Sequence, residues 1–118
     1  MKPKHIYIAG PYTKGDMVMN LRAAIFAADK LAQAGHFPFV PHLSHFWHLV
    51  CPHNYEFWLE QDFAWLEVCD CVLCLPGESV GVEREIEYAK ELGIPVIYKM
   101  EGLSYLFREG QSWFVDKL

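Results

Sequence analysis

The chain has 118 residues, the length of one domain, and 53% of them are hydrophobic, enough to build a single core. Its net charge of −5 and the lack of a basic run argue against a protein that binds DNA or RNA. No apolar run approaches the ~20 residues of a membrane span, and the N-terminus leads directly into a strand pattern rather than a signal peptide. We therefore expect a soluble, cytoplasmic protein with one domain over residues 1–118.

Four short apolar runs alternate with helical patterns along the chain. The expected strands span residues 5–9, 37–40, 69–75 and 94–98, and the expected helices span 16–34, 54–68 and 79–92. Residues 42–53 are ambiguous, and one more helix is expected within 101–118. The alternation predicts an α/β fold with a parallel sheet of four or five strands, covered on both faces. Ligands in such folds bind beyond the carboxyl ends of the strands, which points to the loops 10–15 and 76–81.

The four cysteines predict buried thiols rather than a disulfide framework. Cys69, Cys71 and Cys74 share one apolar run, and Cys51 stands apart. Cys71 and Cys74 form a CxxC pattern, but in a strand they point to opposite faces and no helix N-terminus follows to lower a thiol pKa.

Two carboxylates lie where apolar residues are expected. On a helical wheel, Asp62 falls among the apolar residues of its helix, between Trp58 and Leu66. In the next helix, Glu85 falls among the apolar residues in the same way. A buried carboxylate is costly without a partner, so each acid is either satisfied by backbone or Tyr and Trp donors, or functional. Two convergent carboxylates in a desolvated pocket suit glycosyl transfer, and Tyr7 at the end of the first strand could donate a hydrogen bond to Glu85.

Three motifs in order resemble the nucleoside 2-deoxyribosyltransferase superfamily. They are Ile6-Tyr7-Ile8-Ala9-Gly10-Pro11, then Glu60-Gln61-Asp62-Phe63-Ala64-Trp65-Leu66, then Ser79-x-Gly81-x-x-x-Glu85-x-x-x-Ala89. The closer branch is the 2'-deoxynucleoside 5'-monophosphate N-hydrolases and their small bacterial and phage relatives. The resemblance spans residues 6–98 and is weakest at 42–53.

The resemblance implies a flavodoxin-like fold, a retaining mechanism, no metal and no organic cofactor. By position, Glu85 matches the nucleophile that attacks C1' of the sugar, Asp62 the acid that assists departure of the base, and Tyr7 the residue that positions the nucleophile. The residues implied or expected to surround the substrate are Gly10, Pro11, Tyr12, Thr13, Lys14, Ser79, Gly81, Trp65 and His45. Pro11 departs from the pattern, because the hydrolases often carry a small hydroxyl residue there and proline has no N–H to offer a phosphate.

The partner implied is a nucleoside or nucleotide, and members of the superfamily are oligomers that often complete the pocket from a neighbouring subunit. The aromatic fraction of 15% exceeds what one small core needs, which also predicts a homodimer or larger assembly.

Four histidines, His42, His45, His48 and His53, lie within twelve residues together with aromatic residues. They suit a lid over a base or an interface, and less well a metal site, since zinc needs three or four converging ligands. Besides the glycosidase or transferase, two function classes stay open at this point. One is a non-catalytic nucleotide sensor, and the other is a metal-dependent hydrolase built on these histidines.

Overall fold

A four-stranded parallel sheet forms the centre of the structure, a computed structural model that describes residues 2–103. The strands β1 (His5–Ala9), β2 (Phe37–Phe39), β3 (Cys71–Cys74) and β4 (Val96–Ile97) lie in the order β2-β1-β3-β4. Tyr7 in the centre of β1 pairs with Phe39 on one side and with Val72 on the other. The two central strands are thus β1 and β3, and both are almost entirely buried.

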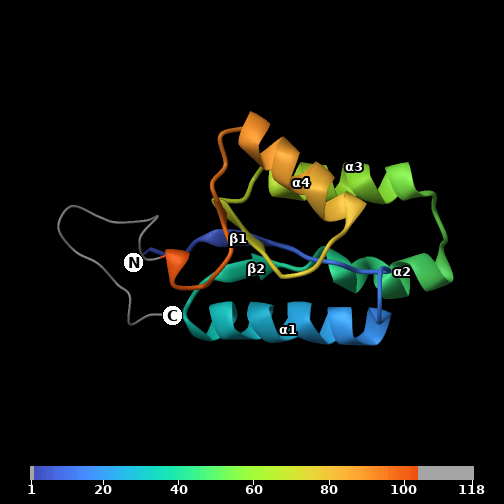
Figure 1. Ribbon diagram of the computed structural model, residues 1–118, viewed down its shortest axis with the longest axis horizontal. Coiled ribbons are helices and arrows are strands. Elements are labelled where there is room, and N and C mark those ends of the chain that lie inside the picture. Colours follow the sequence, from blue (N-terminus) through green and yellow to red (C-terminus); the bar gives the residue numbers. More distant parts are fainter. Residues whose placement is uncertain (1, 104–118) are drawn as a thin grey trace.

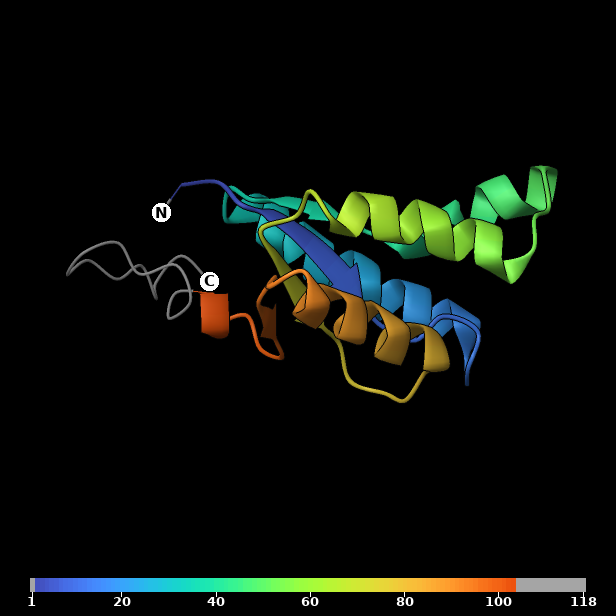
Figure 2. The same cartoon turned by 90° about the horizontal axis from the view of Figure 1, so that it is seen from above.

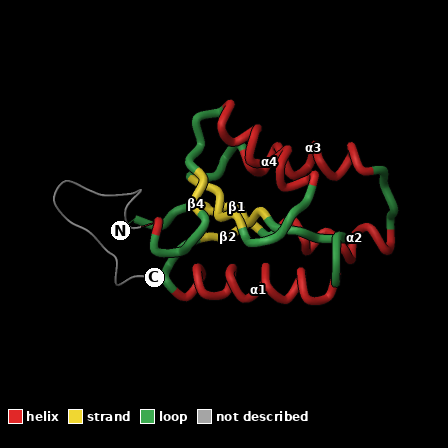
Figure 3. The backbone as a smooth tube through the Cα atoms, viewed as in Figure 1, coloured by secondary structure: helices red, strands yellow, loops and turns green. Residues whose placement is uncertain are grey.

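Helices cover both faces of this sheet. Helix α1 (Met17–Gln33) lies on one face, and α3 (Tyr55–Leu66) and α4 (Val80–Glu91) lie on the other (Figure 1; Figure 3). Seen from above, α3 and α4 run on either side of β1 (Figure 2). The short 3-10 helix η1 (Pro41–Leu43) and helix α2 (Ser44–Val50) connect β2 to α3. No helix of the described residues is long and apolar enough to cross a membrane.

Strand alternation divides the core into two clusters and decides which side chains meet α3 and α4. Successive strand residues point to opposite faces, so Ile6 and Ile8 pack toward α1, whereas Tyr7 and Ala9 pack toward α3 and α4. The same alternation places Cys71 in the first cluster and Cys74 in the second. These two thiols, with Cys69, are free and buried, as the sequence predicts, whereas Cys51 is free but exposed, contrary to the prediction.

The loops after β1 and β3 lie against each other at the carboxyl end of the sheet. The backbone N–H of Leu75 donates to the carbonyl of Ala9 at 2.7 Å. Gly77 has a φ of +116°, and a Cβ atom on it would approach Cγ of Pro11 to 2.6 Å. Only glycine therefore fits here, and the contact brings the two loops together where the strand order reverses.

The α/β class and the parallel sheet are confirmed, with four strands among the described residues. Two of the strands are shorter than expected, since the third contracts to Cys71–Cys74 and the last to Val96–Ile97. The ambiguous segment forms η1 and α2, which end at Val50, followed by a loop. Most of the expected helix within 101–118 lies outside the described residues.

Candidate active site

A cavity of about 560 Å³ opens at the carboxyl ends of β1 and β3, the place that the fold predicts for a ligand. Its size is typical of small-molecule sites. Three parts of the chain build it, namely the loop after β1, the segment from η1 to α3, and the first turns of α4. The lining residues used below are Gly10, Tyr12, Thr13, Lys14, His42, His45, His48, His53, Tyr55, Trp58, Asp62, Ser79, Gly81 and Glu85.

Both inward carboxylates face this cavity, and both helices place them in the same way. In α3, Asp62 is flanked on its buried face by Leu59 and Leu66, three residues before it and four after it. In α4, Glu85 stands between buried residues at the same spacing, which are Val82 and Ala89. Residues at this spacing share one helix face, so each helix that packs on the sheet carries its acid inward with it.

Tyr7 donates its hydroxyl hydrogen bond to Oε2 of Glu85 from the sheet below α4. Burial raises the pKa of Glu85 to about 8. The nearby Asp62 raises this pKa as well, whereas the hydrogen bond from Tyr7 lowers it. Burial also raises the pKa of Asp62 to about 7, and it raises that of Tyr7 well above its ordinary value. Two carboxyl groups with raised pKa values in one cavity are typical of sites that transfer protons near neutral pH.

The buried Glu85 predicts a stability that depends on pH. Its ordinary pKa of 4.5 rises to about 8 in the folded protein, so the native state holds a proton that the unfolded state releases between these values. The wild type should therefore lose stability as pH rises through this window, whereas Glu85→Gln has no charge to bury. We compare the free energies of unfolding of the two proteins, measured with urea at each pH. Between pH 5 and pH 8.5, this free energy should fall by about 3–5 kcal/mol more for the wild type than for Glu85→Gln. Parallel pH profiles for the two proteins would contradict the buried-acid assignment.

The loop after β1 is fixed from two sides. Asn20 of α1 donates from Nδ2 to the carbonyls of Tyr12 at 2.9 Å and Lys14 at 2.8 Å. His42, which is 4% exposed, places Nε2 at 3.0 Å and 3.1 Å from the carbonyls of Gly10 and Pro11. Burial lowers the pKa of His42, so it remains neutral and its Nε2–H donates to these carbonyls. Four hydrogen bonds to backbone carbonyls thus hold the loop that lines the cavity.

The remaining histidines of the cavity lie in a network with aromatic residues. Tyr12 shares a hydrogen bond with Nδ1 of His45 and packs edge-on against His42 and His45. Nδ1 of His48 accepts from the indole N–H of Trp58 at 2.8 Å and from the backbone N–H of His53 at 3.2 Å. Among residues 2–103, no group of three or more His, Cys, Asp and Glu side chains could hold a metal ion.

Another part of the cavity is lined by Lys14 and by the first turns of α4. Ser79 caps α4 by accepting from the N–H of Val82 at 3.4 Å, and Gly81 follows on the cavity wall. Lys14 forms an exposed ion pair with Glu78 at 3.6 Å. A helix N-terminus beside a lysine is favourable for a negatively charged group.

Most of the residues expected from the sequence line the cavity, but three do not. Tyr7 is fully buried and reaches the site only through Glu85, and Pro11 packs on the Gly77 loop instead. Trp65 also lies outside the cavity, since it is 53% exposed and stacks on Phe39 at a centroid distance of 5.4 Å. It lines a second cavity of about 390 Å³, which borders the first at Trp58 and Asp62.

Three lining residues of α3 are not among the site residues predicted from the sequence, namely Tyr55, Trp58 and Leu59. Trp58 had a usable signal, because it stands four residues before Asp62 and therefore on the same helix face. No sequence pattern points to Tyr55, which lies half exposed at the start of α3. It lines the cavity because α4 packs beside it.

Residues 4–99 match the model of a domain of unknown function, DUF7768. No curated protein matches the chain. Among solved structures, a 2-deoxyribosyltransferase from Bacillus psychrosaccharolyticus is similar, with a TM-score of 0.59, 22% identity, and coverage of 78% of this chain and 69% of that protein. A 2-desoxiribosyltransferase from Leishmania mexicana is similar with a TM-score of 0.61, 20% identity and 80% of this chain covered. The chain spans 63% of the Leishmania protein. At these identities the likeness shows a shared fold.

Proposed function

The chain belongs to the DUF7768 family, and we propose that it cleaves or exchanges the N-glycosidic bond of a nucleoside or deoxynucleoside, or of its 5'-monophosphate. The observation that carries this proposal is the pair of carboxyl groups of Asp62 and Glu85, which line one cavity while Tyr7 donates a hydrogen bond to Glu85. The fold shared with two 2-deoxyribosyltransferases supports the same reaction class.

In the proposed mechanism, the reactive form has Glu85 ionised and Asp62 protonated. This form is a minor one at neutral pH, because burial raises the pKa of Glu85 to about 8 and that of Asp62 to about 7. In it, Glu85 attacks C1' of the sugar and forms a covalent glycosyl-enzyme. The bond from C1' to the base breaks, and Asp62 in its protonated form gives its proton to the departing base. Water or a second base then attacks C1', Asp62 takes up the proton of this acceptor, and Glu85 leaves as a carboxylate. Two displacements at C1' retain its configuration.

Tyr7 is a positioning residue in this scheme. It does not line the cavity, and its raised pKa keeps the hydroxyl protonated, so it orients Glu85 without competing for the proton. No metal or organic cofactor takes part in any of these steps.

We propose that the 5' end of the substrate lies near Lys14 and the first turn of α4. Lys14, Ser79 and Gly81 line this part of the cavity, and an ammonium group next to a helix N-terminus favours a phosphate. This arrangement supports a relation to the 5'-monophosphate N-hydrolases. Pro11 supplies no backbone N–H, so any phosphate would be bound without it.

The test is release of free base from a panel of ribo- and deoxyribonucleosides and their 5'-monophosphates, followed by chromatography. We expect at least one substrate to release its base, and the rate to be unchanged by a chelator. Tight binding of a nucleotide without turnover would instead indicate a sensor. Loss of activity with EDTA that zinc restores would indicate a metal-dependent hydrolase.

We also propose that the protein is a homodimer or a larger homo-oligomer. Large apolar side chains are exposed along α2 and at the end of α3, among them Phe46, Trp47, Leu49, Val50, Trp65 and Val68. Contiguous exposed apolar residues of this kind are typical of protein interfaces. Light scattering at high micromolar concentration should give at least twice the mass of one chain, and a monomer would contradict the proposal.

A further inference from the structure

The hydrogen bonds of His48 determine which of its ring nitrogens carries the proton. Nδ1 accepts from the indole N–H of Trp58 at 2.8 Å and from the backbone N–H of His53 at 3.2 Å. Both partners can only donate, so Nδ1 has no hydrogen, and the neutral ring must carry its proton on Nε2. His48 thus presents a fixed N–H donor.

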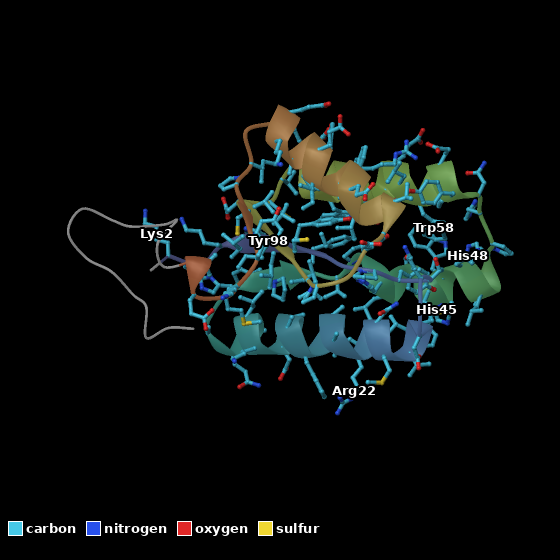
Figure 4. All side chains as sticks on the ribbon, viewed as in Figure 1. Lys2, Arg22, His45, His48, Trp58 and Tyr98 are labelled. Carbon is cyan, nitrogen blue, oxygen red and sulfur yellow. The ribbon has the colours of Figure 1, made fainter. Side chains whose placement is uncertain are left out.

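This donor belongs to a residue that lines the cavity, and it is not buried without a partner. His48 is half-buried and lines the cavity, and in residues 2–103 the buried side-chain nitrogens without a partner are only His36 Nε2 and His42 Nδ1. Nε2 of His48 is therefore not sealed inside the protein. His42 differs, because its Nε2 is occupied by two carbonyls and its Nδ1 is buried. Figure 4 shows His48 beside Trp58 at the end of the molecule where His45 also lies.

The position of His48 relates it to the base rather than to the sugar or the 5' group. Trp58 and Asp62 are four residues apart on α3 and both line the cavity, so they share one wall. In the proposed function Asp62 protonates the base, which places the base along this wall. His48 is hydrogen-bonded to Trp58 and therefore lies at this wall. Lys14 and Ser79, which we assign to the 5' end of the substrate, line the cavity from other segments.

We propose that His48 is a specificity-determining residue that selects bases with a carbonyl oxygen on the edge remote from the sugar. This inference rests on the proposed function, because that function places the base. Natural bases differ at this edge, since guanine, hypoxanthine, uracil and thymine carry an acceptor oxygen where adenine and cytosine carry an amino donor. A fixed N–H donor can form a hydrogen bond with the carbonyl oxygen. Opposite an amino group, which is also a donor, it forms no hydrogen bond, and both donors are left without a partner.

The test compares substrates that differ at this edge, in the carbonyl or amino group and in the ring nitrogen next to it. kcat/KM for base release is measured for deoxyinosine against deoxyadenosine and for deoxyuridine against deoxycytidine, each with and without a 5'-phosphate. We expect kcat/KM to be about tenfold or more higher for the carbonyl member of each pair. This is the effect expected when one substrate gains a hydrogen bond and the other leaves the donor without a partner. Equal rates, or a preference for the amino member, would overturn the proposal.

Variants then assign the preference to His48. In His48→Phe the donor is lost, so the carbonyl substrates should slow about tenfold while the amino substrates do not, and the ratio should approach one. His48→Gln has an amide that can turn to donate or accept, so its ratio should fall between those of wild type and His48→Phe. The matched control is His5→Phe, an exposed histidine at the amino end of β1, which should keep the wild-type ratio. Equal losses on both members of a pair, or losses confined to the monophosphates, would overturn the base assignment.

A binding measurement separates failure of this inference from failure of the proposed function. If no substrate releases its base, the proposed function is wrong, and calorimetry with free hypoxanthine and adenine still tests the donor. Hypoxanthine should then bind the wild type about tenfold more tightly than adenine, and His48→Phe should remove the difference. Equal affinities for the two bases would overturn the inference. Circular dichroism and thermal unfolding of each variant exclude loss of fold as the cause.

Discussion

Replacement of Glu85 by Gln should lower the rate of base release by about 10³-fold or more and leave substrate affinity within a few-fold of the wild type. Gln keeps the shape of the side chain and can still accept the hydrogen bond from Tyr7, but it cannot form the glycosyl ester at C1'. The loss should thus appear in kcat and not in KM. Single-turnover kinetics and calorimetry with the unreacted substrate measure the two effects separately.

The matched control for this variant is Glu87→Gln. Glu87 lies on the solvent-facing side of the same helix and is exposed, so the same chemical change there should leave kcat and KM near their wild-type values. If Glu85→Gln releases base at a near-normal rate, Glu85 is not the nucleophile. Asp62 or an activated water would then have to take this role.

Replacement of Asp62 by Asn should lower base release by about 10²–10⁴-fold for substrates whose base must gain a proton as it departs. Burial raises the pKa of Asp62 to about 7, so the protonated acid is well populated at neutral pH. Asn has no proton to transfer. Deoxynucleosides of N7-methylated purines already carry a positive charge on the base, and with these the variant should approach the wild-type rate.

The recovery with a charged base distinguishes an acid from a residue that only supports the fold. Glu60→Gln is the control on α3, because Glu60 is exposed two residues before Asp62. It should change neither class of substrate. An equal loss for Asp62→Asn on ordinary and N7-methylated substrates would contradict the assignment of Asp62 as the acid.

The fold and the inward direction of the two acids were accessible from sequence because both depend on periodicity. The alternation of apolar runs and helical patterns predicts the layers, and a buried helix face predicts the direction of any residue on it. Asp62 and Glu85 each stand between apolar residues at helical spacing, so their direction follows once the helix is recognised. The pairing of Tyr7 with Glu85 follows from strand alternation, which turns Tyr7 toward α3 and α4.

Features that depend on how separate segments meet were not accessible in this way. Trp65 lies on the apolar side of the predicted helix wheel, but α3 rests near the edge of the sheet, so Trp65 covers Phe39 outside the main cavity. The proton position on His48 depends on donors from Trp58 and His53, which approach only when α2 folds back on α3. A histidine-rich segment in a sequence does not reveal which nitrogens will be occupied.

The central claim, that Glu85 becomes covalently linked to the sugar, is tested most directly by trapping the intermediate. A 2'-fluoro analogue of the substrate found in the panel slows the breakdown of a glycosyl-enzyme. Intact-protein mass spectrometry should show the addition of one fluorinated sugar (with its 5' group), and peptide mapping should place it on Glu85. Base release from the natural substrate with no adduct from the analogue, or an adduct on another residue, would contradict the account.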